Sequence, residues 1–146
     1  MPRLHLEFPD ACLRFRTAMT VRSTEINAGC HLANDALVAL LSEARSRFLF
    51  AHGVDDTRTD GAGPAIIVTD LATVYRAEAR ARDELLFEVG VCDLNRYGGD
   101  IVFRVSRPAD ATQVALAKYG FVFFDYRSGK VASMPAEFRA SVAGVA

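Results

Sequence analysis

The chain has 146 residues, of which 51% are apolar and 24% are charged, and its formal net charge is −1. A chain of this length can bury one sizeable core, so we expect a single domain over residues 1–146 and exclude an intrinsically disordered protein. A nearly balanced charge creates no field that would hold a polyanion, which argues against nucleic-acid binding.

The cysteines and histidines are too scattered to indicate a disulfide framework or a metal site. They are Cys12, Cys30, Cys92, His5, His31 and His52. The N-terminal stretch has charges among its apolar residues and lacks the continuous apolar region of a signal peptide. No run approaches the roughly 18 apolar residues that a membrane span needs. We therefore expect a cytoplasmic protein that binds neither a membrane nor a metal.

The first regular elements are predicted to be a strand followed by one long helix. A rough alternation predicts a strand over residues 17–23. Asn34 is a favourable N-cap, and Asp35 lies where a carboxylate stabilises the positive end of a helix dipole. From there to about residue 52 the apolar residues follow a 3.6-residue period and cover much of the cylinder, so we predict a helix buried on most sides. Gly53 is placed to end it.

Four strand-like runs follow, each rich in β-branched and aromatic residues. They cover residues 65–76, 84–94, 100–107 and 113–126. Gly, Asn, Asp and Pro separate the later runs at hairpin lengths, which predicts a meander of antiparallel strands. A strand, one helix and then four strands is an α+β pattern.

The end of the chain and the outer face of the sheet give two further expectations. Residues 135–142 are predicted to form one short helix. A single long helix cannot cover both faces of the sheet, so the apolar residues of 113–126 predict burial against a second copy of the chain.

Four strings, in this order, resemble the hotdog-fold acyl-CoA thioesterases of the 4-hydroxybenzoyl-CoA thioesterase type, over about residues 16–140. The strings are EINAGCHLAN (25–34), LLSEARSRFL (40–49), VYRAEARARDEL (74–85) and SGKVASMP (128–135). The resemblance implies a hotdog fold, in which an antiparallel sheet wraps around one long central helix. It also implies hydrolysis of an acyl-CoA or acyl-carrier thioester by a homodimer or homotetramer. No cofactor is expected, since coenzyme A is part of the substrate.

The resemblance places the reacting carbonyl at the N-terminus of the central helix. Free N–H groups near Ala33, Asn34 and Asp35 would polarise it, because they point along the helix dipole. The carboxylate that assists attack in this branch of the family is Asn27 here, and an amide cannot take a proton from water. We expect Asn27 to orient water through its amide. His31 occupies the position of the family's loop histidine, which orders the loop or lies beside the substrate.

With Asn27 in that position, another carboxylate must assist the water. Glu43 lies eight residues beyond Asp35, which is about 12 Å along a helix at ~1.5 Å per residue. It cannot reach its own helix start, but it could reach the partner's across antiparallel helices, as in a related branch of the superfamily. The alternative for Glu43 is a surface pair with Arg47. Glu25, expected to end a strand, is the second candidate.

Tyr75 belongs to the third family-like string and is expected at the substrate. Coenzyme A carries phosphates, so basic residues are expected near the mouth of the site. The candidates are Arg76, Arg80 and Arg96. The alternative is a solvated, charge-balanced edge, because carboxylates alternate with the first two arginines.

Two other functions stay open from the sequence. A catalytically silent hotdog protein that binds a thioester or serves as an assembly unit is compatible with Asn27. A hotdog dehydratase would pair a histidine such as His31 with a helix acid such as Glu43. The Gly/Pro-rich string that follows the histidine in dehydratases is absent here.

Overall fold

The structure is a computed structural model that describes residues 3–58 and 60–144. Its helices are η1 (Asp10–Cys12), η2 (Ser23–Glu25), α1 (Asn34–Ala51) and α2 (Ala136–Val142), of which η1 and η2 are 3₁₀ helices. Its strands are β1 (Phe15–Thr20), β2 (Ala65–Tyr75), β3 (Glu84–Cys92), β4 (Gly98–Arg107), β5 (Thr112–Asp125) and β6 (Lys130–Val131).

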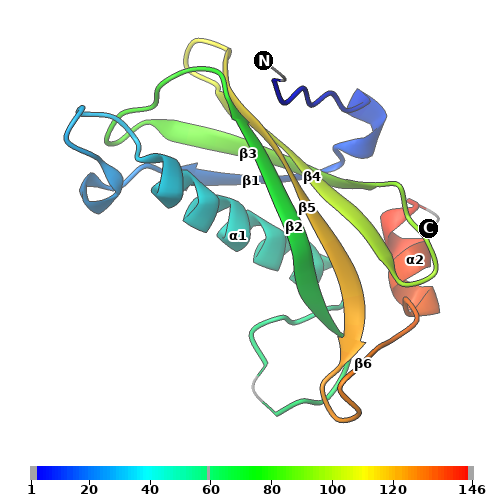
Figure 1. Ribbon diagram of the computed structural model, residues 1–146. Coiled ribbons are helices and arrows are strands. Elements are labelled where there is room, and N and C mark those ends of the chain that lie inside the picture. The colour runs from blue at the N-terminus through cyan, green and yellow to red at the C-terminus, as the bar shows by residue number, and fades with distance from the viewer. Residues whose placement is uncertain (1–2, 59, 145–146) are drawn as a thin grey trace.

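The strands form one antiparallel sheet in the order β1-β3-β4-β5-β2, and β6 pairs with β5. The sheet curls around α1, which is the hotdog arrangement (Figure 1). The predicted hairpins β3–β4 and β4–β5 are confirmed, but a continuous meander is wrong, because β2 pairs with β5 and β1 takes the place beside β3. Residues 76–83 are not a hairpin turn. They pass the start of α1, where the N–H of Leu32 donates to the carbonyl oxygen of Ala79 at 2.7 Å.

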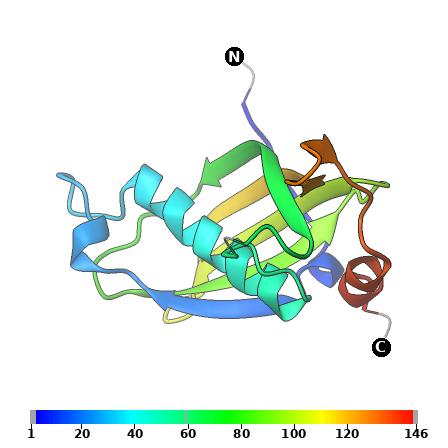
Figure 2. The ribbon, with the colours of Figure 1, turned by 90° about the horizontal axis from the view of Figure 1, so that it is seen from below.

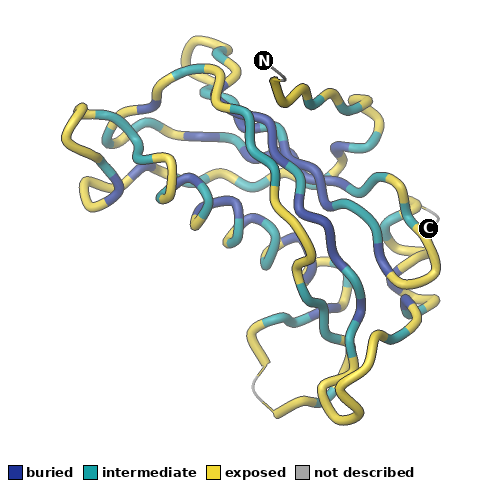
Figure 3. Tube along the Cα trace, viewed as in Figure 1, coloured by how far each residue is buried: buried dark blue, intermediate teal, exposed yellow. Residues whose placement is uncertain are grey.

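One side of α1 forms the core with the concave face of the sheet, as seen from below in Figure 2. Leu41, Ala44 and Leu49 are fully buried, as are Phe87 of β3 and Phe103 of β4. This follows from the 3.6-residue period of the apolar residues. Figure 3 shows buried positions alternating with exposed ones along the helix.

The expectation that α1 is buried on most sides is wrong for the protomer. Ala39 and Glu43 are exposed, and Phe50 is 69% exposed. The sheet is curled but reaches only one side of the helix, so the opposite side faces solvent. Gly53 ends the helix as predicted, with a φ of +85° that favours glycine.

Three predicted element boundaries differ from those of the structure by one or more residues. The first strand occupies Phe15–Thr20 rather than 17–23, because the chain turns into η2 there. Glu25 is therefore the last residue of η2 and does not end a strand. Asn34 is the first helical residue, while Ala33 is the N-cap and contributes no side-chain hydrogen bond.

The outer face of the sheet is covered in part by the chain itself. Residues 3–14 run over the side away from α1 (Figures 1 and 2), where Leu13, Val102 and Leu116 are buried outside the main core cluster. The apolar residues of 113–124 are thus buried or half-buried within the protomer, contrary to the prediction, and only Tyr126 at the end of this run is exposed.

Exposed apolar side chains lie instead on β2, including Val68 and Leu71, each 41% exposed. Strand β2 is at the edge of the sheet. Among the described residues, no helix is long and apolar enough to cross a membrane.

Candidate functional site

The loop before α1 is ordered by the side chain of Asn27. Its Oδ1 accepts the backbone N–H groups of Gly29 at 3.0 Å and His31 at 3.4 Å. The Asn27 N–H donates to the carbonyl oxygen of His31 at 3.0 Å. Of the polar groups of Asn27, only the side-chain NH₂ makes no hydrogen bond to the described residues. Asn27 can therefore contact a ligand as a hydrogen-bond donor.

Gly29 brings two polar side chains of this loop together. A Cβ at this position would lie 3.1 Å from Nε2 of His31 and 3.3 Å from Oδ1 of Asn27. These separations are too tight for a methyl group unless the neighbours move. Glycine therefore allows the imidazole of His31 to fold back over the turn.

The start of α1 presents fewer free N–H groups than the sequence suggested. The N–H of Ala33 donates to the carbonyl oxygen of Glu25 at 2.9 Å, so it is already satisfied. Asp35 accepts the N–H of Ala36 at 3.0 Å through its own carboxylate. Among the described residues, the N–H groups of Asn34 and Asp35 have no protein acceptor. They are the donors that could face a carbonyl oxygen.

A cavity of about 370 Å³ lies between this helix start and the chain that leaves β2. It brings together five of the predicted site residues: Asn27, His31, Asn34, Tyr75 and Arg76. The hydroxyl of Tyr75 donates to the carbonyl oxygen of Asn34 at 3.1 Å. Burial, and to a smaller extent the charge of Asp35, raises the pKa of Tyr75. The hydroxyl therefore stays protonated at neutral pH and remains a donor.

The cavity also contains a carboxylate that the sequence did not single out, that of Glu78. Its Oε1 lies 3.6 Å from Nε2 of His31, and its Oε2 lies 3.8 Å from Nη2 of Arg80. Glu78 lies in the third of the strings that resemble the family, VYRAEARARDEL (74–85), at a position where the family's corresponding string has proline. That replacement is the one signal in the sequence that could have drawn attention to it.

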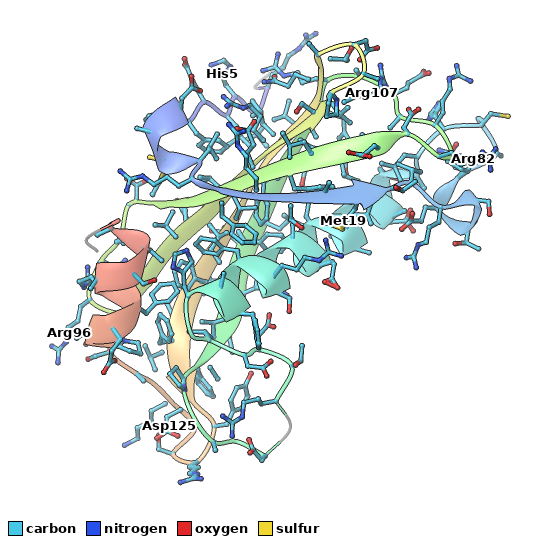
Figure 4. The ribbon with its side chains drawn as sticks, turned by 180° about the vertical axis from the view of Figure 1, so that it is seen from behind. His5, Met19, Arg82, Arg96, Arg107 and Asp125 are labelled. Atoms are coloured by element: carbon cyan, nitrogen blue, oxygen red, sulfur yellow. The ribbon has the colours of Figure 1, made fainter. Side chains whose placement is uncertain are left out.

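The two carboxylates predicted to act lie elsewhere in the protomer. Glu43 and Glu25 line a separate groove beside β1, near the labelled Met19 (Figure 4). Glu43 is half exposed and lies 3.5 Å from Arg47, its predicted alternative partner. Action of Glu43 from a partner subunit stays a prediction.

Glu25 is 7% exposed and is bound by Arg22, whose backbone N–H donates at 2.7 Å and whose guanidinium donates at 3.1 Å. Burial alone would raise the pKa of Glu25, but the hydrogen bonds and charge of Arg22 outweigh it and keep the pKa below its usual range. Glu25 therefore stays ionised and holds η2 in place.

The predicted phosphate-binding arginines do not cluster. Arg76 lines the cavity, while Arg80 is exposed beside it and close to Glu78. Arg96 lies at the other end of the molecule from Arg82, next to α2 (Figure 4). Its Nε donates to Ser133 at 3.3 Å. Arg96 is therefore far from the start of α1.

Over residues 3–58 and 60–144, no three His, Cys, Asp or Glu side chains come together in a way that could hold a metal ion.

Comparison with known proteins identifies the class to which this site belongs. A family model described as the thioesterase-like superfamily matches residues 21–142. This range is most of the chain and contains the cavity. The chain therefore belongs to the thioesterase-like superfamily, and its fold is that of the hotdog acyl-CoA thioesterases. No curated protein matches the chain in sequence.

Solved structures support the fold at low sequence identity. The 1,4-dihydroxy-2-naphthoyl-CoA thioesterase from Synechocystis has a TM-score of 0.81 and 15% identity, covering 90% of this chain and 96% of its own. A Staphylococcus aureus protein solved in complex with CoA has a TM-score of 0.81 and 16% identity, with coverages of 88% and 81%. A gentisyl-coenzyme A thioesterase has a TM-score of 0.76 and 12% identity, with coverages of 89% and 100%.

Proposed function

We propose that this protein hydrolyses the thioester bond of an acyl-CoA or acyl-carrier substrate bound at the start of α1. The observation that carries the proposal is that Asn27, His31, Asn34 and Glu78 line one cavity. This cavity lies at the helix start, where the N–H groups of Asn34 and Asp35 have no acceptor among the described residues. Membership of the thioesterase-like superfamily supports the same reaction. No cofactor is proposed, because coenzyme A arrives as part of the substrate.

The N–H groups of Asn34 and Asp35 are proposed to bind the thioester carbonyl oxygen. Negative charge develops on this oxygen as water attacks, and preformed donors at a helix N-terminus stabilise it without reorganisation. Removal of one such donor in other hydrolases costs about 10²–10³-fold in kcat. Tyr75 fixes the helix start from the side of β2, through its bond to the Asn34 carbonyl oxygen.

His31 and Glu78 are proposed to activate the water. The imidazole takes a proton as the water oxygen attacks the carbonyl carbon, and the carboxylate 3.6 Å away stabilises the resulting imidazolium. When the carbon–sulfur bond breaks, the imidazolium returns the proton to the departing thiolate. The products are a carboxylic acid and free coenzyme A thiol. The NH₂ of Asn27 can hold the water in place as a donor.

The alternative source of the carboxylate is Glu43 of a second protomer, as the sequence suggests. This alternative requires a homodimer or homotetramer, which the exposed apolar residues of β2 favour. Light scattering at micromolar concentration measures the oligomeric state. A stable monomer would exclude the contribution of Glu43 from a partner but would leave the His31–Glu78 pair intact.

The test of the function is a panel of acyl-CoA thioesters, assayed by release of free thiol. We expect hydrolysis of at least one member, with loss of activity in His31→Ala. No hydrolysis by a folded protein that still binds coenzyme A would favour the catalytically silent alternative. Hydration of an enoyl thioester without hydrolysis would favour a dehydratase.

A further inference from the structure

A second cavity, of about 380 Å³, lies on the outer face of the sheet beneath the N-terminal segment, residues 3–14. We call it the outer cavity. Leu6, Phe8 and Leu13 of this segment line one side, and Arg104, Gln113 and Leu116 of the sheet line the other. His5, labelled in Figure 4, lies at its rim. The volume is within the range of small-ligand sites, roughly 300–1,000 Å³.

One residue, Arg76, lines both the outer cavity and the cavity at the start of α1. It follows the last residue of β2, where its N–H donates to the carbonyl oxygen of Val114 at 2.8 Å. Val114 lines the first cavity, and its neighbour Gln113 lines the outer one. The two cavities are therefore on opposite faces of the sheet but meet at one point of its border.

The charges of the outer cavity distinguish its two arginines. Arg104 is held by Glu88, at 3.0 and 3.2 Å, and by Asp10, which also lines the cavity. The other acidic lining residue, Glu7, lies 3.9 Å from His5. Arg76 is exposed and, within the part of the chain that the structure describes, makes no ion pair. A guanidinium with free N–H donors binds phosphate through paired hydrogen bonds.

We propose that the outer cavity binds the nucleotide end of coenzyme A, with Arg76 on its phosphates and Phe8 against the adenine. This inference rests on the proposed function, which places the thioester in the first cavity. The flexible arm of coenzyme A separates the thioester from the nucleotide, so the nucleotide needs a second site. A path over Arg76 joins the two.

The apolar side of the outer cavity suits a flat base. Phe8 is half-buried and Leu116 is 7% exposed, so both present apolar surface in a cavity that is otherwise polar. Stacking of a base on an aromatic ring contributes about 1–3 kcal/mol. The N-terminal segment precedes residues 21–142, which the family model matches. The proposed nucleotide site is therefore built partly from a segment of this chain that lies outside the family match.

The experiment measures binding of adenosine 3′,5′-bisphosphate by isothermal titration calorimetry. This probe carries the base, the 3′-phosphate and the first 5′-phosphate of coenzyme A. Wild-type protein should bind it, and Phe8→Ala and Arg76→Gln should each weaken binding by about tenfold or more. Arg127→Ala, an exposed arginine in the turn after β5, is the matched control and should bind as wild type does. Inorganic phosphate alone should bind much more weakly, since it lacks the base.

Kinetics provide the second measurement. The same acyl group is supplied on coenzyme A and on N-acetylcysteamine, a thioester that has no nucleotide. Phe8→Ala should raise KM for the coenzyme A thioester about tenfold and affect the N-acetylcysteamine thioester much less. Equal changes with both substrates, in a variant whose melting temperature matches wild type, would overturn the nucleotide site.

The two proposals fail in distinguishable ways. If the bisphosphate binds in a Phe8-dependent manner but no thioester is hydrolysed, the proposed hydrolysis fails and the outer cavity remains a nucleotide site. If thioesters are hydrolysed but the bisphosphate does not bind, or binds Phe8→Ala as well as wild type, the outer cavity is not the nucleotide site. Binding of ADP as tight as that of coenzyme A would indicate a site for free nucleotides and overturn its link to the thioester.

Discussion

The two ends of α1 have opposite surroundings. At the C-terminal end, the ring of His52 packs against both Phe48 and Phe138 of α2. Phe138 in turn packs against Phe123 at a ring distance of 5.1 Å. At the N-terminal end, a loop places polar side chains around an open cavity. The contrast indicates that the C-terminal end, which we call the packed end, stabilises the fold. The N-terminal end, which we call the open end, leaves N–H groups and ionisable side chains accessible from the cavity.

The largest expected effect on stability comes from removing the aromatic packing at the C-terminal end of α1. Phe138 is 1% exposed and contacts three aromatic rings, those of Phe121, Phe123 and His52. Phe138→Ala should lower the free energy of unfolding by about 3–5 kcal/mol, because it removes a buried ring and leaves a cavity. Urea unfolding measures this loss. The proposed thioester hydrolysis, measured per folded molecule, should change little, and a parallel loss of activity would show that the two ends are coupled.

At the open end, Glu78→Gln removes the charge that is proposed to stabilise the His31 imidazolium. It should lower kcat by about 10²-fold, the lower range for general acid–base catalysis. The melting temperature should change little, because Glu78 is 61% exposed. Glu137→Gln on α2 is the control, since it changes an exposed carboxylate at the packed end.

Glu43→Gln decides between the two sources of the carboxylate. If Glu43 acts across a dimer, this substitution lowers kcat strongly without a change in oligomeric state or melting temperature, while Glu78→Gln has little effect. Wild-type activity in Glu43→Gln would show that Glu43 serves only its ion pair with Arg47.

A smaller gain is expected from Asn27→Asp. Aspartate keeps the oxygen that accepts the N–H groups of Gly29 and His31, so the loop should retain its shape. It also adds a carboxylate beside the bound carbonyl, and hydrolysis should rise by about tenfold, a fraction of a full general-base effect. Steady-state kinetics measure the change. A loss of activity would show that the NH₂ donor of Asn27 is itself required.

The packed end should also respond to acid. Burial lowers the pKa of His52 below its ordinary value of 6.5, and its Nδ1 hydrogen-bonds Ser141 of α2 at 2.5 Å. The unfolded chain therefore takes up this proton at a higher pH than the folded one. The contribution of neutral His52 to stability is complete above pH 6.5 and falls as the pH drops toward the lowered value.

His52→Gln removes this titration, so urea midpoints at pH 7.5 and pH 5 should differ more for wild type than for the variant. Equal differences would mean that His52 does not contribute to the acid sensitivity.

The smallest effect concerns thiol reactivity, which should differ between Cys92 and Cys30. Burial, together with the neighbouring Cys12, raises the pKa of Cys92 to about 12, whereas Cys30 is exposed in the loop before α1. Thiolate is the reactive form, so Cys92 should resist a disulfide reagent at pH 8 in the folded protein. Cys30→Ser should remove the fast-reacting thiol. Rapid reaction of Cys92 would show that the packed end opens readily.

Local patterns in the sequence determined most of the secondary structure. The 3.6-residue period and Gly53 predicted α1 nearly to the residue, and Gly, Asn, Asp and Pro marked the hairpins of β3, β4 and β5 correctly. These features depend on neighbours within a few residues, which a sequence displays directly. Family-like strings also indicated the hotdog fold and placed Asn27, His31 and Asn34 at one site.

Tertiary structure alone decided what surrounds that site. Strand β2 pairs with β5 rather than β3, and this non-local pairing carries Glu78 to His31 and Arg76 to the border between two cavities. The N-terminal segment covers the outer face, although nothing in its own pattern indicates where it lies. Such contacts join residues far apart in the chain, and they form because the sheet must bury its apolar face. No short-range pattern of the sequence encodes that geometry.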